Sequence, residues 1–239
     1  MYTNVPKLRY SPEMTASTPV VLLHGFATSS ARTWWENGWL DLLKEAGREP
    51  VAIDILGHGN ADKPHDPAAY ADLEGWVAER LPDGPLDAIG FSLGARLLLG
   101  VAMADPARFR RLVVLGVGRN LFERGAADVI VDAIRSGDAP ENPAADYFAR
   151  LAAHPENDRE ALLACLRAPM RLLTAEGLSR VEASVLVVIG ERDFAGPADP
   201  LVEALPDARL VVLPRTDHFS TPKDFLAMDA ALKFLEDGQ

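Results

Sequence analysis

Short apolar runs alternate with stretches of helical periodicity along most of the chain. The apolar runs predict buried strands at residues 20–23, 51–54, 86–91, 111–115, 185–189 and 209–213. Apolar positions at helical spacing predict helices at residues 35–46, 67–80, 92–104, 199–205 and 219–235. Strands that are apolar throughout and alternate with helices are typical of a parallel sheet with both faces covered, so we expect the α/β class.

The alternation stops between residues 119 and 180. Helical patterns at 126–135, 144–153, 159–166 and 170–176 follow one another there, separated by prolines, and no strand pattern appears before residue 185. We therefore predict three parts: residues 1–118 and 181–239 form one doubly wound α/β core, and residues 119–180 form a helical lid over the strand ends. The first eighteen residues form either an edge hairpin around residues 7–10 or no regular structure.

Composition and charge narrow the choice of partners and compartment. The net charge of −11 disfavours nucleic acid and anionic membrane surfaces as partners, which leaves a small-molecule substrate. Cys165 is the only cysteine, so no intramolecular disulfide can form, and its simplest role is a small buried residue of a lid helix. We see no leader peptide or membrane-spanning run and expect a cytoplasmic protein, whose oligomeric state the sequence leaves open.

One serine lies where a predicted strand meets a predicted helix. In Gly90-Phe91-Ser92-Leu93-Gly94, glycine stands two residues away on either side, which is the pattern of a nucleophile elbow. Such a turn strains the serine backbone, and strand and helix approach so closely that side chains at positions 90 and 94 would collide. The alternative is that Ser92 only caps the helix that follows.

With three further loops, this motif resembles the α/β-hydrolase superfamily, in particular its small lidded esterases, lactonases and carbon–carbon-bond hydrolases. The resemblance covers about residues 19–235. His24-Gly25-Phe26 is similar to the oxyanion loop, and residues 54–59 are similar to an Asp-x-x-Gly-x-Gly turn, although Asn60 stands where many relatives carry serine. Residues 190–193 resemble the acid-bearing loop and residues 217–219 the histidine loop, in the chain order of this fold.

The resemblance implies a triad of Ser92 as nucleophile, His218 as base and Asp193 as the acid that orients the histidine. His218 is the one histidine that follows the last predicted strand. Other carboxylates compete with Asp193 for the third role, namely Glu191, Asp199 and Asp217, and Asp193 could instead be a solvated loop residue. The backbone N–H groups of Phe26 and Leu93 are the implied oxyanion donors.

Five residues are candidates for the substrate pocket: His24, Gly25, Trp34, Phe91 and Phe122. Helical spacing favours a place in the core for Trp35 and Trp39. A solvated surface position is the better interpretation of the lid arginines, which are Arg119, Arg124 and Arg150. No histidine or cysteine pair has metal-ligand spacing and no phosphate-binding glycine loop follows a strand, so we expect neither a metal nor a cofactor.

These features predict a serine hydrolase that cleaves a small, largely apolar carboxylic ester, lactone or thioester through an acyl-enzyme on Ser92. One alternative keeps the triad but uses it for carbon–carbon-bond hydrolysis, lyase or perhydrolase chemistry. The other is a ligand-binding protein of the same fold without useful turnover.

Overall fold

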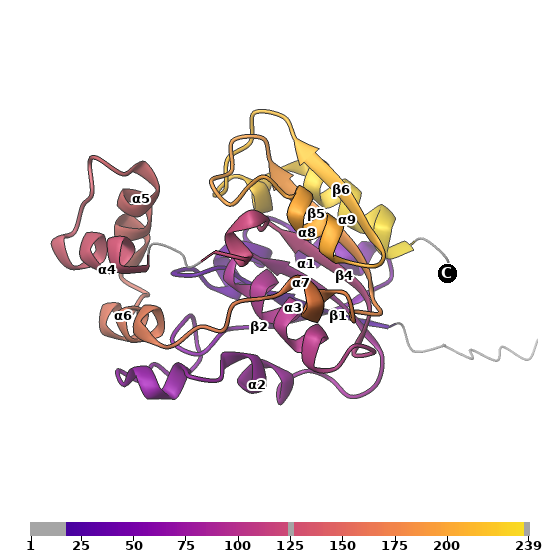
Figure 1. The fold of residues 1–239 in the computed structure, drawn as a ribbon, viewed down its shortest axis with the longest axis horizontal. Coiled ribbons are helices and arrows are strands. Elements are labelled where there is room, and N and C mark those ends of the chain that lie inside the picture. Colours follow the sequence, from indigo (N-terminus) through magenta and orange to yellow (C-terminus); the bar gives the residue numbers. More distant parts are fainter. Residues whose placement is uncertain (1–17, 124–126, 237–239) are drawn as a thin grey trace, which may run out of the picture.

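Six parallel strands form the centre of the molecule (Figure 1). The computed structural model describes residues 18–123 and 127–236. The strands are β1 (Pro19–Leu23), β2 (Glu49–Ile53), β3 (Leu86–Phe91), β4 (Phe109–Leu115), β5 (Ser184–Gly190) and β6 (Ala208–Leu213). They lie in the order β2-β1-β3-β4-β5-β6, and each neighbouring pair is parallel, so the predicted α/β class is confirmed.

Helices cover both faces of this sheet. On one face lie α1 (Trp39–Glu45) and α9 (Phe225–Glu236). On the other lie α2 (Leu73–Ala78), α3 (Leu93–Ala104), α7 (Ala175–Leu178) and α8 (Asp199–Ala204). Alternate residues of β1 enter different cores, since Val20 and Leu22 pack with α1 and α9 whereas Val21 and Leu23 pack with the second group. Burial on both faces explains why the strands are apolar without alternation.

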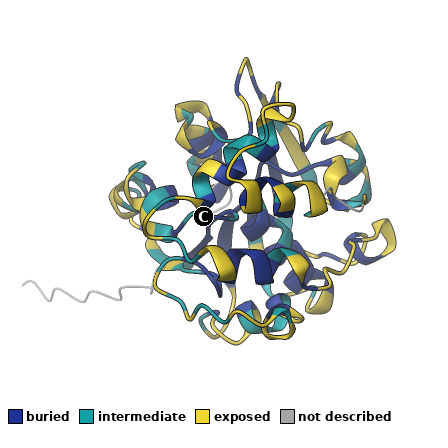
Figure 2. Cartoon of the chain, turned by 90° about the vertical axis from the view of Figure 1, so that its left-hand side faces the viewer, coloured by how far each residue is buried: buried dark blue, intermediate teal, exposed yellow. Residues whose placement is uncertain are grey.

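Three helices between β4 and β5 pack beside the sheet rather than on its faces (Figure 1). They are α4 (Ala127–Ser136), α5 (Pro143–Ala152) and α6 (Arg159–Arg167). Side chains of all three form a small apolar cluster around Ala27, which lies in the loop after β1. Figure 2 views the molecule from this side, with buried segments in the middle and exposed turns around the rim. The predicted lid segment thus contacts a loop at the carboxyl end of β1.

Several predicted helices are shorter than expected because side chains cap them late. The Asp72 carboxylate accepts a hydrogen bond from Gly75 N and starts α2 after a separate 3-10 turn, η2 (Pro67–Tyr70). The Thr174 hydroxyl accepts from Gly177 N in the same way, so the helix expected at 170–176 begins only at residue 175. The helix expected at 219–235 begins at residue 225, after the 3-10 turn η4 (Thr221–Lys223).

The expectation for Trp35 is wrong, whereas that for Trp39 is confirmed. The helix predicted at 35–46 is divided into a π-helical turn, η1 (Ala31–Trp35), and α1, with Gly38 at a φ of 82° between them. The break changes the phase of the helix, so Trp39 is buried and Trp35 is 66% exposed. Cys165 is buried in α6 as expected, and burial raises the pKa of its thiol to about 12.

The last two expectations concern the N-terminal segment and membrane-spanning helices. The hairpin considered at residues 7–10 lies outside the described residues. Over residues 18–123 and 127–236, no helix is both long enough and apolar enough to cross a membrane.

Candidate active site

Ser92 lies in a sharp turn between β3 and α3. Its φ of 51° and ψ of −109° are unfavourable for a residue with a side chain, which marks a strained position. A Cβ atom at Gly90 would lie 2.6 Å from the Cα of Ala95, and one at Gly94 would collide with the carbonyl oxygen of Leu23. Both glycines are therefore required by the close approach of strand and helix. Ser92 occupies the cap position of α3, but its hydroxyl makes no capping hydrogen bond, which contradicts the simple N-cap interpretation.

Three side chains from the ends of three strands form one chain of hydrogen bonds. The Ser92 Oγ atom lies 3.0 Å from Nε2 of His218, which follows β6. The Nδ1 atom of His218 lies 2.9 Å and 3.0 Å from the two carboxylate oxygens of Asp193, which follows β5. Since a carboxylate only accepts, the proton belongs on Nδ1, and Nε2 is left to accept from the serine hydroxyl.

Burial and a backbone contact hold this arrangement in place. The side chains of His218 and Asp193 are almost completely buried, so water competes little for their hydrogen bond. One Asp193 oxygen also accepts from the backbone N–H of Ala195 at 2.8 Å. A Cβ atom at Gly190 would collide with the carbonyl oxygen of Thr216, so glycine lets the loops that carry the acid and the histidine run close together.

The competing carboxylates lie elsewhere, two of them in hydrogen bonds to backbone N–H groups. Asp217 accepts from the backbone N–H of Ser220, and Glu191 accepts from that of Arg215. Asp199 opens α8. Of the four candidate acids, the structure brings Asp193 to the imidazole of His218.

The predicted oxyanion loop runs alongside the serine turn. The backbone N–H of Gly94 donates to the carbonyl oxygen of His24 at 3.0 Å, which ties the loop to α3. A Cβ atom at Gly25 would lie 3.5 Å from Cβ of Ser92, so the backbone that leads to Phe26 passes next to the serine. Leu93 is the first residue of α3, and the N–H groups of a first helical turn have no partner within the helix.

Two buried histidines support this loop from behind. Nε2 of His24 accepts from the backbone N–H of Ile55 at 3.0 Å, and the ring of His58 contacts the rings of His24 and Phe26. Burial lowers the pKa of both histidines, that of His58 to about 3. Both are therefore neutral parts of the scaffold at neutral pH, and the structure does not place the His24 side chain in the pocket wall.

These buried histidines predict a loss of stability in weak acid. The folded-state pKa of His58 lies below its ordinary value of 6.5, so between about pH 6.5 and pH 3 the unfolded chain binds a proton that the folded chain does not. The free energy of unfolding should then fall as pH falls, by about 1 kcal/mol per pH unit from this group. Urea unfolding at pH 7 and pH 5 measures the difference.

His58→Gln should reduce that difference, because glutamine does not titrate. The same substitution at His154, which is partly exposed, is the matched control for the loss of a histidine side chain. An equal difference in His58→Gln and the parent would contradict the prediction.

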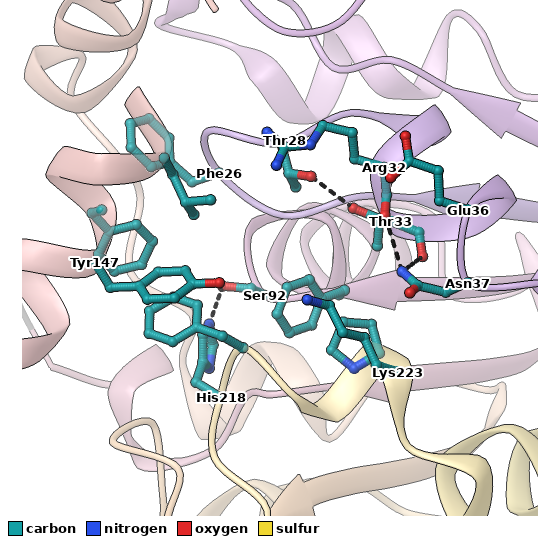
Figure 3. Close-up of a pocket in the computed structure, with 15 residues that line it drawn as sticks. Phe26, Thr28, Arg32, Thr33, Glu36, Asn37, Ser92, Tyr147, His218 and Lys223 are labelled. Atoms are coloured by element: carbon teal, nitrogen blue, oxygen red, sulfur yellow. Dashed lines mark hydrogen bonds between the residues drawn. The ribbon is translucent and has the colours of Figure 1, made fainter. Parts of the chain in front are cut away.

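Two cavities meet at Ser92. The smaller, of about 150 Å³, extends from Ser92 and His218 between η1 and η4 (Figure 3). The larger, of about 440 Å³, extends from Ser92 beneath α4 and α5, and its wall is mainly apolar. The side chain of Phe148, in α5, lines both cavities. A bound molecule that reaches the serine can therefore extend in two directions.

Aromatic side chains that the sequence analysis did not single out surround the histidine. Tyr147 stacks on Phe219 with ring centroids 3.6 Å apart, and Phe194 lies 4.3 Å from the ring of His218. Phe148 contacts Phe219 edge to face. Phe194 and Phe219 directly follow Asp193 and His218 in the sequence, which is a signal that could have found them. The positions of Tyr147 and Phe148 depend on how α5 packs.

The structure places the predicted pocket residues in different surroundings. Phe91 lines the smaller cavity. Trp34 is buried in the core against Trp39, and Phe122 lines a separate hollow beside α8. Gly25 does not line either cavity but allows the close approach described above.

The lid arginines agree with their expected solvated positions as far as they are described. The Arg119 and Arg150 side chains are more than half exposed, and each pairs with a carboxylate on its own segment. Arg124 lies outside the described residues. Within residues 18–123 and 127–236, no three histidine, cysteine, aspartate or glutamate side chains cluster in a way that could hold a metal ion.

Comparisons with known proteins place this chain in a family. The model of a family described as "Alpha/beta hydrolase family" matches residues 20–229. A pimeloyl-[acyl-carrier protein] methyl ester esterase of Nitrosomonas europaea is 28% identical, over 92% of this chain and 98% of that protein. A 2-hydroxy-6-oxo-2,4-heptadienoate hydrolase of Pseudomonas putida is 34% identical, but the match covers 45% of this chain and 40% of that protein.

Structural similarity extends over nearly the whole chain. The solved structure of a 2-hydroxy-6-oxo-6-phenylhexa-2,4-dienoate hydrolase from Rhodococcus sp. strain RHA1 superposes with a TM-score of 0.69 at 22% identity. The superposition covers 92% of this chain and 90% of that one. At this identity the likeness concerns the fold.

Proposed function

This chain belongs to the α/β-hydrolase family, and from that premise we propose that it is a serine hydrolase acting on a carboxylic ester, lactone or thioester. The observation that carries the proposal is the continuous hydrogen-bonded chain from Asp193 through His218 to Ser92. A serine hydroxyl is a weak nucleophile until a neighbouring base accepts its proton, and His218 Nε2 lies at the distance that this transfer needs.

In the first half of the reaction, the Ser92 oxygen attacks the substrate carbonyl while His218 takes its proton. The negative oxygen that develops is stabilised by the backbone N–H groups of Leu93 and Phe26. Asp193 keeps the histidine in the required tautomer and stabilises the imidazolium. His218 then gives the proton to the leaving group, and the acyl-enzyme remains.

In the second half, His218 takes a proton from water, which attacks the acyl-enzyme carbonyl. The same N–H groups stabilise the second tetrahedral intermediate. Its collapse releases the carboxylic acid and returns the proton to Ser92. The triad thus serves twice without net change, as the proposed acyl transfer requires.

We assign a lid role to the segment 119–180 within this proposal. Phe148 of α5 lines both cavities, and α4 and α5 roof the larger one. Its mainly apolar wall favours a largely apolar substrate portion, and a roof over Ser92 would exclude water during the first step.

Carbon–carbon-bond hydrolysis with the same triad is a second candidate. It is favoured by the Pseudomonas putida relative, which its name describes as a dienoate hydrolase and which matches nearly half of this chain. The Nitrosomonas europaea relative, matched over almost its full length, is named as an esterase and favours the first candidate. A purely ligand-binding role is the weaker alternative, because it leaves the aligned triad without a purpose.

Labelling by a fluorophosphonate tests the proposal directly. We expect one phosphonyl group per chain, attached to Ser92, as seen by intact mass and peptide mapping, because the reagent reacts with serines activated by a base. Hydrolysis of a series of esters of increasing chain length, in the acyl or the alcohol portion, would then define the apolar portion. Absence of labelling, or labelling spread over surface hydroxyl groups, would contradict an activated Ser92.

A further inference from the structure

The smaller cavity carries cationic side chains that the proposed chemistry does not use. We propose that it binds a carboxylate on the substrate, with Arg32 as the main ligand and Lys223 as the second. The inference rests on the proposed function, since it names the substrate class of that site: an ester whose short acyl portion ends in a free carboxylate and whose remainder is apolar. Arg32 and Lys223 both line the cavity that opens at Ser92.

Among the residues that the structure describes, the Arg32 guanidinium has no hydrogen-bond or ion-pair partner. Its Nη1 atom is buried without a hydrogen bond, and among the described residues no carboxylate lies within 4.0 Å of the group. The backbone beneath it is fixed, because Ser29 Oγ accepts from Arg32 N and the Arg32 carbonyl accepts from Asn37 Nδ2 at 2.9 Å. A cation held beside a cavity with part of its surface withdrawn from water is stabilised when an anion enters.

Lys223 stands on the other side of the same cavity. Figure 3 shows Arg32 on the η1 side of the cavity and Lys223 on the η4 side. Ser92 lines the same cavity. Trp39 Nε1 donates to the carbonyl oxygen of Pro222 at 2.7 Å, which anchors η4 to α1. The Lys223 side chain itself is exposed and has no ion pair within the described part of the chain. Its position therefore suits a second, adjustable contact.

The charge balance of the cavity favours an anion. Glu36 also lines it, but it is exposed and does not form an ion pair with Arg32 among the described residues. Two cations and one carboxylate leave a positive balance in a chain whose net charge is −11. A planar guanidinium can hold a carboxylate through two parallel hydrogen bonds, which fixes its direction as well as its charge.

The larger cavity offers a useful contrast. Arg96 lies in its wall, but Nη1 of Arg96 is 3.6 Å from a carboxylate oxygen of Glu74, so this cation is already compensated. The rest of that wall is mainly apolar. The structure therefore separates an anion-binding end at Arg32 from an apolar end beneath α4 and α5, with the serine between them.

A matched pair of esters tests this separation. Benzyl hydrogen succinate carries a free carboxylate, and benzyl levulinate has the same shape with a neutral methyl ketone in its place. We expect the parent protein to have the higher kcat/KM for the succinate half-ester. Arg32→Gln should lower kcat/KM for that substrate by about 10- to 100-fold and leave the levulinate ester nearly unchanged.

Two further variants should show intermediate losses of the preference for the half-ester, and a third controls for the loss of one positive charge. Arg32→Lys should retain part of the preference, since the charge stays but the two-point contact is lost, and Lys223→Gln should cause a smaller loss than Arg32→Gln. Arg135→Gln removes the same charge from the exposed surface of α4 and should leave both esters unaffected. Equal losses for both esters in Arg32→Gln, or no preference in the parent, would overturn the inference.

Binding to the Ser92→Ala variant separates failure of this inference from failure of the proposed function. Calorimetry with benzyl hydrogen succinate should show binding that a further Arg32→Gln change weakens about tenfold or more and that added salt reduces. Selective binding without turnover in the parent would overturn the hydrolase and keep the anion site. Turnover of the levulinate ester with no selectivity for the half-ester would overturn the anion site and keep the hydrolase.

Discussion

Ser92→Ala is expected to lower kcat for ester hydrolysis by about 10⁵-fold. The variant removes the atom that would form the proposed acyl-enzyme and leaves the neighbouring glycines and the proposed backbone N–H donors in place. Alanine meets the same positive φ as serine at this turn, so the free energy of unfolding should change little. Steady-state kinetics with a chromogenic ester, together with urea unfolding, separates the two effects.

Ser220→Ala is the matched control for this change. Ser220 is exposed in the loop that follows His218, and only its backbone N–H takes part in a hydrogen bond with Asp217. The variant should retain parental kcat and fluorophosphonate labelling. A Ser92→Ala protein as active as Ser220→Ala would rule out the acyl-enzyme.

Asp193→Asn is expected to lower kcat by about 10⁴-fold with little change in KM. The amide group can donate to Nδ1 of His218, which would place the imidazole proton on Nε2 and leave no acceptor for the serine hydroxyl. The loss concerns the proton transfer rather than substrate binding, so it should fall on kcat. Full kinetic curves for the parent and the variant measure the two constants separately.

Asp217→Asn provides a control of the same chemistry one residue from the histidine. Its carboxylate accepts from Ser220 N and does not contact the imidazole ring, so kcat should remain within a few-fold of the parent. Fluorophosphonate labelling should slow in Asp193→Asn and stay at the parental rate in Asp217→Asn. The opposite pattern would transfer the orienting role to Asp217.

The strands and the loops that carry the proposed triad could be predicted because both depend on local sequence. The apolar run 86–91 coincides with β3, since a strand buried on both faces admits apolar or small residues along its whole length. Parallel strands place their carboxyl ends at one edge of the sheet. Residues that follow β3, β5 and β6 therefore had to come near one another, although the hydrogen bonds that select Asp193 over Asp217 appear only in the structure.

The positions of two aromatic side chains differ from those expected, because a helix is interrupted in one case and the chain changes direction in the other. Trp35 and Trp39 share one face of a continuous helix, but the break at Gly38 turns Trp35 to the surface. Phe122 is an aromatic residue shortly after a strand, yet η3 (Arg119–Leu121) directs the chain toward α8 instead of the serine. Periodicity does not report such changes of direction.

The cationic end of the site was missed for a related reason. The arginines that sequence reasoning considered lie in the segment 119–180, whereas Arg32 belongs to a short π-helical turn after β1. Nothing in its sequence neighbourhood distinguishes it from an exposed arginine. Its place in the cavity that opens at Ser92 appears only in the folded chain, where η1 and η4 line that cavity and Trp39 of α1 donates a hydrogen bond to the Pro222 carbonyl of η4.

The late position of β6 has a consequence for biosynthesis. Among the described strands, β6 lies at an edge of the sheet and pairs with β5, and the loop after it supplies His218. A nascent polypeptide that has emerged as far as the loop after β5 already contains Ser92 and Asp193 but lacks the imidazole of His218. The proposed hydrolase would therefore stay inactive until its final strand docks and brings His218 to the other two side chains.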